Sequence, residues 1–309
     1  MINATAQHVL KTYSYKAYGL NIHSAMEIPE LTAGNGAAPD LKIHFGNVPV
    51  TLPNKTSEGV LYEAMLEELV FFIQNVARYH IRNGNEIIID TAPGADMNEV
   101  KLYLLGTPFG VLLHQRDNLV LHGSTIVNGE HCIAFIGPSG IGKSTLVAAL
   151  EKRGYPVMTD DICTISFTGD NSCPVVQPES HSIRLWEDAL VKLGRNTDEL
   201  SPIKNGLKKY HFSMKNFHPH PAKLQKIYVL TKIDAPQIKL EDLRSVLKIK
   251  YLSQNTYRSR FVAGLGKSMN HFKLCTQVAS AIPIIKITRP RQGFLLDELV
   301  EILEEDLKT

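Results

Sequence analysis

The residues best suited to do chemistry in this chain form one short glycine-rich stretch that ends in a lysine and two hydroxyl side chains. The stretch consists of Gly137, Pro138, Ser139, Gly140, Ile141, Gly142, Lys143, Ser144 and Thr145. It fits the pattern G-x-x-x-x-G-K-[ST], in which backbone N–H groups turn inward around phosphate oxygens. Lys143 is expected to reach the β- and γ-phosphates, and the Ser144 hydroxyl to bind Mg²⁺. The stretch therefore predicts a site for a nucleoside triphosphate and Mg²⁺.

The segments on either side of this stretch have the pattern that such a loop requires. An apolar run from Cys132 to Ile136 predicts a buried strand that leads into the loop. Apolar residues between Leu146 and Leu150 predict a helix, whose N-terminus adds positive potential at the phosphates. A glycine-rich turn without a ligand is the alternative, and this strand–loop–helix context disfavours it.

Two polar groups flank the loop at distances that suit catalysis. His122, in the segment His-Gly-Ser, lies 21 residues before Lys143, and Asp160 and Asp161 lie 17 and 18 residues after it. In phosphate-loop proteins an acid on a neighbouring strand binds Mg²⁺ directly or through water. A second carboxylate can take the proton from an attacking hydroxyl. Paired acids in a turn are otherwise common as solvated or capping residues, so the nearby loop is what favours a catalytic role.

This set of motifs resembles the catalytic domain of HPr kinase/phosphorylase, a bacterial family that phosphorylates a serine on a sugar-transport phosphocarrier. The resemblance covers about forty residues, from 121–124 through the loop to 153–154 and the acid pair. A looser resemblance extends over most of the chain, through 15–31 and Ser182–Trp186. It is to the shorter HPr kinase-like proteins of lasso-peptide gene clusters, which phosphorylate the C-terminal serine of a ribosomal precursor peptide.

The resemblance implies an ATP-dependent serine kinase, a phosphotransferase that uses ATP and Mg²⁺. Asp160 corresponds to the carboxylate that takes the proton, and Asp161 helps Ser144 to hold Mg²⁺. His122 is placed beside the γ-phosphate as an orienting or charge-stabilising group, together with Lys143. The implied acceptor is the C-terminal serine of a lasso-type precursor peptide. A carrier protein or a small hydroxylated metabolite is the alternative acceptor, and a non-catalytic nucleotide-binding switch is the alternative function.

One part of the family pattern is missing from this chain. Phosphocarrier kinases have a glycine-rich signature after the acid pair, and residues 177–186 occupy that region here. The resemblance therefore does not extend to the phosphocarrier substrate, the phosphorylase activity or the hexameric assembly, and the state of assembly is left open.

Other motifs support weaker interpretations. Residues 231–234, Thr-Lys-Ile-Asp, imitate the guanine-reading motif of GTPases, but the D-x-x-G motif that a GTPase needs before this point is missing. Arg184 either binds a phosphate or carboxylate or pairs with a neighbouring acid. Lys208 and Lys209 are more typical of solvated lysines than of phosphate ligands. The remaining candidates are histidines: His211, His218 and His220 favour a polar loop over a metal site, and His80 and His114 are expected to be structural.

Composition limits the class of protein. With 309 residues, 44% hydrophobic and 21% charged, the chain is typical of a globular protein of one large or two ordinary domains. The four cysteines form no C-x-x-C pair and are expected to be buried free thiols. The first sixteen residues lack the order of a signal peptide, and no apolar run is long enough to span a membrane. We expect a cytoplasmic protein without a membrane partner.

The net charge of +2 hides an uneven distribution. Residues 201–293 contain eighteen lysines and arginines against three acids, which gives this segment a net charge of +15. Either a basic surface faces an anionic ligand, or the segment pairs with the acidic rest of the chain. The basic residues are scattered and no nucleic-acid-binding motif accompanies them, so we expect no nucleic acid partner. A C-terminal serine also presents a carboxylate, for which Arg184 or a cation between Lys204 and Arg291 is the expected partner.

The elements that position these residues divide the chain into two regions. Residues 1–118 predict a β-rich N-terminal domain that ends in a helix, broken near Gly106, and residues 119–309 predict the phosphate-loop domain. The first has predicted strands at Tyr13 to Ile22, 41–45, 69–74, 77–81 and 86–90, with a hairpin turn at 82–85. The second has predicted strands at 119–127, 131–136, 157–159, 162–167, 226–232 and 283–287, and a helix at 295–306. A tight turn at 128–130 makes the first two of these strands antiparallel neighbours. The predicted fold is α/β with a mixed sheet, of the HPr kinase and ATP-dependent phosphoenolpyruvate carboxykinase type.

Overall fold

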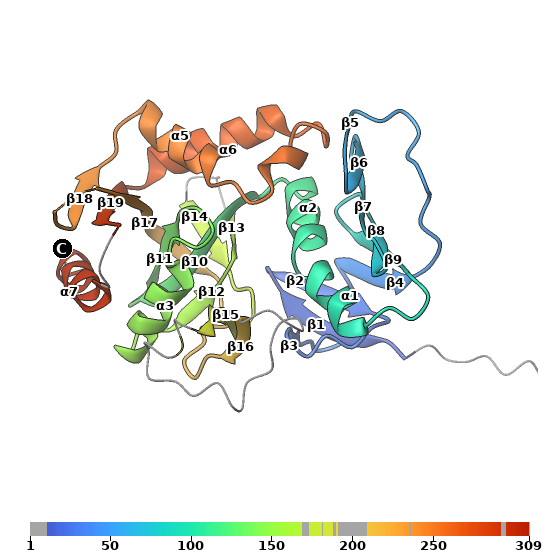
Figure 1. Cartoon of the computed structure of the whole chain (residues 1–309), viewed down its shortest axis with the longest axis horizontal. Helices are drawn as coiled ribbons and strands as arrows, with labels where there is room; N and C mark the ends of the chain where they lie inside the picture. The colour runs from blue at the N-terminus through green and yellow to red at the C-terminus, as the bar shows by residue number, and fades with distance from the viewer. Residues whose placement is uncertain are drawn as a thin grey trace, which may run out of the picture.

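Short runs of alternating apolar and polar residues form strands in the first ninety residues. A second set of strands surrounds residues 137–145, which are called the phosphate loop after the motif that they fit. The computed structural model describes residues 11–168, 173–180, 182–187, 190, 209–234, 236–291 and 295–308, with the backbone alone at 168, 182–186, 209 and 211–213. The described chain is α/β, with a nine-stranded, an eight-stranded and a two-stranded sheet. Both larger sheets mix parallel and antiparallel pairs. Figure 1 shows the first sheet on the right and the second on the left.

The nine-stranded sheet has the order β3-β1-β2-β4-β9-β8-β7-β6-β5. Its strands are β1 (Tyr13–Ala17), β2 (Leu20–Ser24), β3 (Thr32–Ala33), β4 (Leu41–Phe45), β5 (Ser57–Gly59), β6 (Tyr62–Met65), β7 (Glu68–Ile73), β8 (Ala77–Arg82) and β9 (Glu86–Thr91). The hairpin predicted between β8 and β9 is confirmed, with Asn83 and Gly84 at φ +54° and +64°. The single strand predicted from Tyr13 to Ile22 is instead a hairpin, because Tyr18 (φ +54°) and Gly19 form a tight turn. A tyrosine rarely adopts this conformation, so the sequence gives little sign of the turn.

Two short helices follow the first sheet. They are α1 (Met97–Leu104) and α2 (Thr107–Gln115), and they confirm the predicted break near Gly106. The Asp96 side chain caps α1 by accepting from the Asn98 N–H at 2.9 Å, and Pro108 lies in the first turn of α2. Both helices bury apolar residues in the core that lies over the first sheet.

The eight-stranded sheet holds the phosphate loop. Its strands are β10 (Leu119–Asn128), β11 (His131–Ile136), β12 (Val157–Thr159), β13 (Ile162–Thr168), β14 (Cys173–Gln177), β17 (Ala222–Ile233), β18 (Lys239–Asp242) and β19 (Ile284–Pro290), while β15 (Ser182–Trp186) and β16 (Lys209–Ser213) form the two-stranded sheet. β10 and β11 are antiparallel neighbours, and β11 is parallel to β17, which confirms the predicted mixed sheet. Because β14 also pairs with β17, the strands β11, β10, β13, β14 and β17 close into a ring, which β19 and β18 extend.

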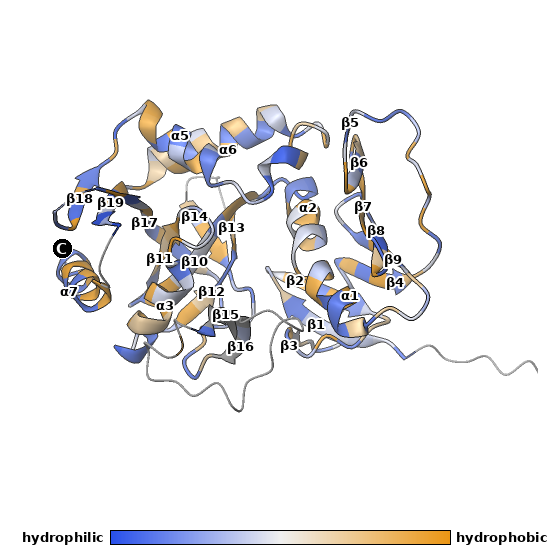
Figure 2. Cartoon of the chain, viewed as in Figure 1, coloured by the Kyte–Doolittle hydropathy of each residue, from blue (hydrophilic) through white to orange (hydrophobic). Residues whose placement is uncertain are grey.

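Helices cover both faces of this second sheet. They are α3 (Lys143–Lys152), α5 (Val246–Gln254), α6 (Ser268–Ala281) and α7 (Leu296–Asp306), with a short 3-10 helix at Ser259–Phe261. Successive residues of β11 point to opposite faces: Phe135 packs in the core with α3 and α7, and Ala134 and Ile136 pack in the core with α5 and α6. Figure 2 shows α7 with an apolar and a polar side, as expected for a helix that covers a sheet.

The two halves share a continuous core. The core cluster of the first half also contains Val120, Tyr257 and Phe261 from the second half. The contact between the two halves is called the seam. There, His114 Nε2 lies 2.8 Å from the Tyr257 backbone oxygen. Across it, Lys267 forms ion pairs with Glu67 and Asp117, at 2.7 and 2.9 Å. A domain boundary after residue 118 therefore remains a prediction from sequence.

Two general expectations concern thiols and membrane spans. All four cysteines are free, as predicted. Cys132, Cys163 and Cys275 are buried, whereas Cys173 is partly exposed, so the predicted burial is confirmed for three of the four. Burial raises the pKa of Cys163 and of Cys275 to about 12, so these thiols are poor nucleophiles. In the part of the chain that the structure describes, no helix combines the length and the apolar character that crossing a membrane requires.

Candidate functional site

The phosphate loop leaves β11 after Ile136 and enters α3 at Lys143. Gly140 and Gly142 have φ of +77° and +101°, a region that side-chain-bearing residues avoid. A side chain at Gly137 would meet the Leu230 backbone oxygen at 2.9 Å, so the close approach of β17 also requires glycine there. The sequence therefore folds here into the tight loop that the motif predicted, at the N-terminus of a helix.

Lys143 is held over the loop that precedes it. Its Nζ donates to the backbone oxygens of Gly137 and Pro138, at 2.8 and 3.2 Å, and its side chain is buried. The ammonium group is thereby positioned inside the ring of backbone groups that is predicted to surround phosphate oxygens.

The acid pair lies beside the loop because of strand register. β10 runs antiparallel to both β12 and β13, and only Asp160 and Asp161 separate these two strands. Thr125 pairs with Thr159 and His122 with Ile162, a register that puts Ser124 opposite Asp160. The polar residues flanking the loop in sequence therefore come together across one pair of strands.

The Asp160 carboxylate joins the loop to β10. Its Oδ1 accepts hydrogen bonds from the Ser144 hydroxyl at 2.8 Å and from the Ser124 hydroxyl at 2.7 Å. Asp160 is only 5% exposed, so both hydroxyls are fixed in a site largely closed to water. In the structure Asp160 makes the hydrogen bond to Ser144, and the expected role of Asp161 in holding Mg²⁺ together with Ser144 stays a prediction.

Asp161 faces a different partner. Its Oδ1 lies 3.1 Å from Nδ1 of His122, and its backbone oxygen lies 3.2 Å from the same nitrogen. Asp161 has φ of +83°, an uncommon conformation for a residue with a side chain. The backbone N–H of Gly123 donates to the Asp161 oxygen at 3.3 Å and supports this turn. The two neighbouring carboxylates therefore occupy distinct environments, one bonded to the loop serine and one to a histidine.

Glu179 connects this site to the first half of the chain. Its Oε2 accepts from the Asp160 backbone N–H at 2.8 Å, and its Oε1 accepts from the Tyr18 hydroxyl at 2.9 Å. The Tyr18 N–H also donates to the Pro178 oxygen at 2.7 Å. The turn between β1 and β2 thus lies against the segment that supports the acid pair.

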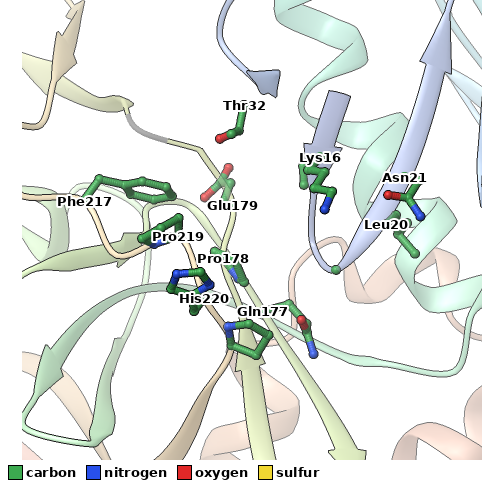
Figure 3. A pocket seen from close by; sticks show the side chains of 13 residues that line it. Lys16, Leu20, Asn21, Thr32, Gln177, Pro178, Glu179, Phe217, Pro219 and His220 are labelled. Carbon is green, nitrogen blue, oxygen red and sulfur yellow. The ribbon is translucent and has the colours of Figure 1, made fainter. Parts of the chain in front are cut away.

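A cavity of about 450 Å³ lies at the seam beside Glu179. Figure 3 shows Lys16 and Asn21 of the first half on one side of it and Phe217, Pro219 and His220 on the other. Such a volume is ordinary for a small-ligand site. Glu179 lines the cavity and accepts from the Asp160 backbone N–H, so this one side chain connects the cavity to the acid pair.

Arg289, at the end of β19, also lies at the loop. β19 is parallel to β17 and β17 to β11, so the three strands end at the same edge of the sheet. A Cβ atom placed on Gly142 would lie 2.9 Å from Nη2 of Arg289. The guanidinium group therefore packs directly on the loop backbone beside Lys143.

Mg²⁺ fits the oxygens gathered at this point. The Ser144 hydroxyl and the Asp160 carboxylate are hard oxygen donors within hydrogen-bond distance of each other, which is the ligand chemistry that Mg²⁺ prefers. No group of three or more His, Cys, Asp or Glu suited to a metal occurs among the residues that the structure describes. In His218 and His220 the rings lie 5.8 Å apart on the loop before β17, and the His211 side chain lies outside the described residues.

The remaining predicted candidates lie apart from the acid pair or outside the described side chains. Residues 231–234 end β17 at the loop edge, but the Thr231 hydroxyl donates to the Ile287 oxygen and Asp234 is 90% exposed in a pair with Arg291. Arg184 lies on β15 with its side chain outside the described residues. Lys208 lies outside them altogether, and Lys209 is described by its backbone alone.

The two predicted structural histidines have ordinary partners. His80 Nε2 lies 2.8 Å from Glu68 Oε2 in a buried position. His114 is buried at the seam, and desolvation lowers its pKa to about 4. Neither histidine points to a second site.

Comparison with known proteins yields distant similarity to solved structures. No family model matches the chain, and no curated protein matches it. Among solved structures the chain is similar to the Hpr(Ser) kinase/phosphatase from Coxiella burnetii, with 15% identity and a TM-score of 0.32, over 60% of this chain and 89% of that chain. A similarity at this level assigns no residue, so the roles considered below rest on the distances given above.

Sequence reasoning missed three residues of the site. Tyr18 and Glu179 contact the site only through the pairing of distant segments, and no local pattern marks them. Arg289 was detectable, because it directly follows an apolar strand, and ligands of α/β sheets bind at the carboxyl ends of parallel strands.

Proposed function

We propose that this protein is an ATP-dependent kinase that transfers the γ-phosphoryl group to a serine hydroxyl. The observation that carries the proposal is the convergence of the Ser144 and Ser124 hydroxyls on Oδ1 of Asp160, at 2.8 and 2.7 Å. The serine of a phosphate loop binds Mg²⁺, so an acid bonded to it lies at the metal. A nucleotide switch needs no further acid, whereas here Asp161 stands beside His122 as a candidate proton acceptor.

We assign the two carboxylates to different tasks. The hydrogen bond from Ser144 supports Asp160 as the acid that holds Mg²⁺ together with the loop serine. Asp161, with His122 beside it, is then the group that receives the proton of the acceptor hydroxyl. This assignment reverses the one that the sequence resemblance implies, in which Asp160 takes the proton and Asp161 binds the metal.

In the transfer, the acceptor oxygen forms a bond to the γ-phosphorus. The bond from that phosphorus to the β–γ bridging oxygen breaks, and ADP leaves with the electron pair. The hydroxyl proton passes to Asp161, which His122 orients. Lys143 and the loop N–H groups offset the phosphate charge, and Mg²⁺ supplies further neutralisation when bound. Because the transition state is loose, most of the rate comes from positioning these groups.

The finer proposal for the acceptor is the C-terminal serine of a ribosomal precursor peptide of the lasso type. The cavity at the seam supports an acceptor of a few residues, because it has about 450 Å³ and lies against Glu179. Lys16 in its wall offers a cation for the carboxylate beside the serine hydroxyl. A small hydroxylated metabolite or a carrier segment would use the same cavity without needing that cation.

The acceptor test combines purified protein, Mg·ATP and synthetic peptides that end in Ser, Ser-amide or Ala. Mass spectrometry should detect phosphate on the Ser peptide, less on the amide and none on the Ala peptide. Equal labelling of the acid and the amide would refute carboxylate recognition. No labelling of any peptide would leave the carrier or metabolite as acceptor, and ATP hydrolysis insensitive to every acceptor would favour the switch.

The division between the two acids has its own test. Asp161→Asn should lower turnover by about 10²–10⁴-fold and leave the affinity for Mg·ATP nearly unchanged. Asp160→Asn should weaken Mg·ATP binding and shift the Mg²⁺ dependence of turnover to higher concentration. If Asp160→Asn instead removes turnover at unchanged Mg·ATP affinity, the assignment implied by the resemblance is the correct one.

A further inference from the structure

Arg289 is the cation at the loop edge that the proposed mechanism does not use. It lies one residue before the end of β19, at the edge where the phosphate loop leaves β11. Its Nη2 is 2.9 Å from the position that a Cβ of Gly142 would take, so glycine at 142 leaves room for the guanidinium group. The side chain thus reaches the first turn of α3, where the phosphate-binding N–H groups lie.

This guanidinium group is poorly satisfied by the protein around it. Its Nε is buried without a hydrogen-bond partner, and no ion pair joins it to an acid among the residues that the structure describes. Desolvation lowers the pKa of Arg289, which reflects a charge held away from water. By contrast Arg291, two residues on, is 64% exposed and pairs with Asp234 at 3.6 Å. A partly buried guanidinium group whose Nε has no acceptor costs stability unless an anion binds it.

We propose that Arg289 is a second cation of the triphosphate site and binds a phosphate of the nucleotide beside Lys143. The inference rests on the proposed nucleotide site and not on the identity of the acceptor. The carboxylate of an acceptor peptide is a less suitable partner for Arg289. The acceptor is proposed to bind in the cavity beside Glu179, and Arg289 does not line that cavity. A planar guanidinium can offer two parallel donors to one phosphate, which an ammonium group cannot.

The test compares Arg289→Gln with the matched control Arg291→Gln, using the full chain. Titrations measure the affinity for Mg·ATP and for inorganic tripolyphosphate, and thermal melts without ligand measure folding. Arg289→Gln should weaken both ligands by a similar factor of about ten or more, the equivalent of a charged hydrogen bond. Its melting temperature without ligand should stay equal or rise, because a partly buried charge with an unpartnered Nε is removed. Arg291→Gln should change none of these values.

Four results would overturn the proposal. If Arg289→Gln lowers the melting temperature but leaves both affinities unchanged, the arginine is structural. If it weakens ATP but not tripolyphosphate, Arg289 contacts the base or the ribose. If the unmodified protein binds neither ligand, the nucleotide site itself fails and this inference with it. Normal binding by the unmodified protein and by Arg289→Gln alike would refute only the inference about Arg289.

Discussion

In the nine-stranded sheet, consecutive strands are joined largely by tight turns, and polar side chains such as His44 and Glu86 pair with each other, 2.9 Å apart. In the eight-stranded sheet, β11, β17 and β19 run parallel and end at one edge, where the chain continues into the phosphate loop and Arg289. Parallel strands gather loop residues from distant parts of the sequence at one edge, and antiparallel hairpins do not. The nine-stranded sheet also has parallel pairs, β2 with β4 and β4 with β9, so strand direction alone does not place the candidate site. The comparison teaches that the residues at the ends of β11 and β19 set the second sheet apart. The first half contacts the site through Tyr18 and the cavity wall.

The largest loss of turnover should come from replacing Lys143 of the loop. The control is Lys101 of the first half, which forms an ion pair. Lys143→Ala removes the cation held by Gly137 and Pro138, so turnover should fall by about 10²–10³-fold and nucleotide affinity should weaken. Lys101→Ala, which removes an ion pair with Glu30, should leave both unchanged. Steady-state kinetics and nucleotide titration check the pair. Equal losses from both variants would mean that the chemistry is not confined to the second half.

The second effect concerns the seam that joins the halves. Burial lowers the pKa of His114 from 6.5 to about 4. Between these values the unfolded chain binds the proton and the folded protein does not, so stability falls as the pH falls through this window. The loss should reach about 3 kcal/mol for this residue alone. The pKa of His271 is also lowered by burial, which adds to the loss in the same direction.

Chemical denaturation at pH 7.5 and pH 5 should measure about 2 kcal/mol of this loss, because the rest is lost below pH 5; His114→Gln is the comparison. Glutamine keeps an N–H donor for the Tyr257 oxygen but does not titrate. The variant should therefore have a flatter dependence of stability on pH. An unchanged slope in His114→Gln would assign the acid sensitivity to other groups.

The proximity of the loop, the acid pair and His122 could be predicted, because their residue types and their spacing along the chain fit a known motif. The antiparallel start of the second sheet could also be predicted, from the turn at 128–130 between two apolar runs. The different hydrogen-bond partners of Asp160 and Asp161 could not be predicted, because they accompany a φ of +83° at Asp161. The spacing of residues along the chain does not determine the backbone conformation at Asp161.

Several elements of the fold could not be predicted either. Strands β5 and β6 contain two glutamates and few apolar residues, so their alternation is weak, and they form because β7 pairs with β6. Helix α6 has Met269 and Phe272 on its exposed side, which blurs the apolar stripe expected of a surface helix. In each case tertiary pairing or packing decides the structure, and a local pattern does not.

The cavity offers a third way to test the comparison, because both halves build its wall. Thr32→Trp, in β3 of the first half, would fill part of the space beside Glu179. The KM for the acceptor should rise by roughly tenfold, while the KM for ATP stays constant, because the loop is built by the other half. Val50→Trp, at a position 81% exposed on the first half, is the control. A rise in both KM values, or in neither, would mean that the acceptor does not bind in the cavity.

The smallest predicted effect is on kcat/KM, and it tests whether the first half only supports the fold or also positions residues of the site. Tyr18→Phe and Tyr15→Phe each delete one buried tyrosine hydroxyl in neighbouring strands and turns of the first half. The Tyr15 hydroxyl accepts from the Ile28 N–H and so bonds within that half, whereas the Tyr18 hydroxyl donates to Glu179.

Both variants should lose about 0.5–1.5 kcal/mol of stability, the usual value of a single hydrogen bond. Only Tyr18→Phe should also lower kcat/KM for the acceptor, by about two- to tenfold, because Glu179 holds the backbone of Asp160. Denaturation and initial rates separate the two quantities. Identical kinetics in the two variants would show that the nine-stranded sheet supports the fold without setting the geometry of the acid pair.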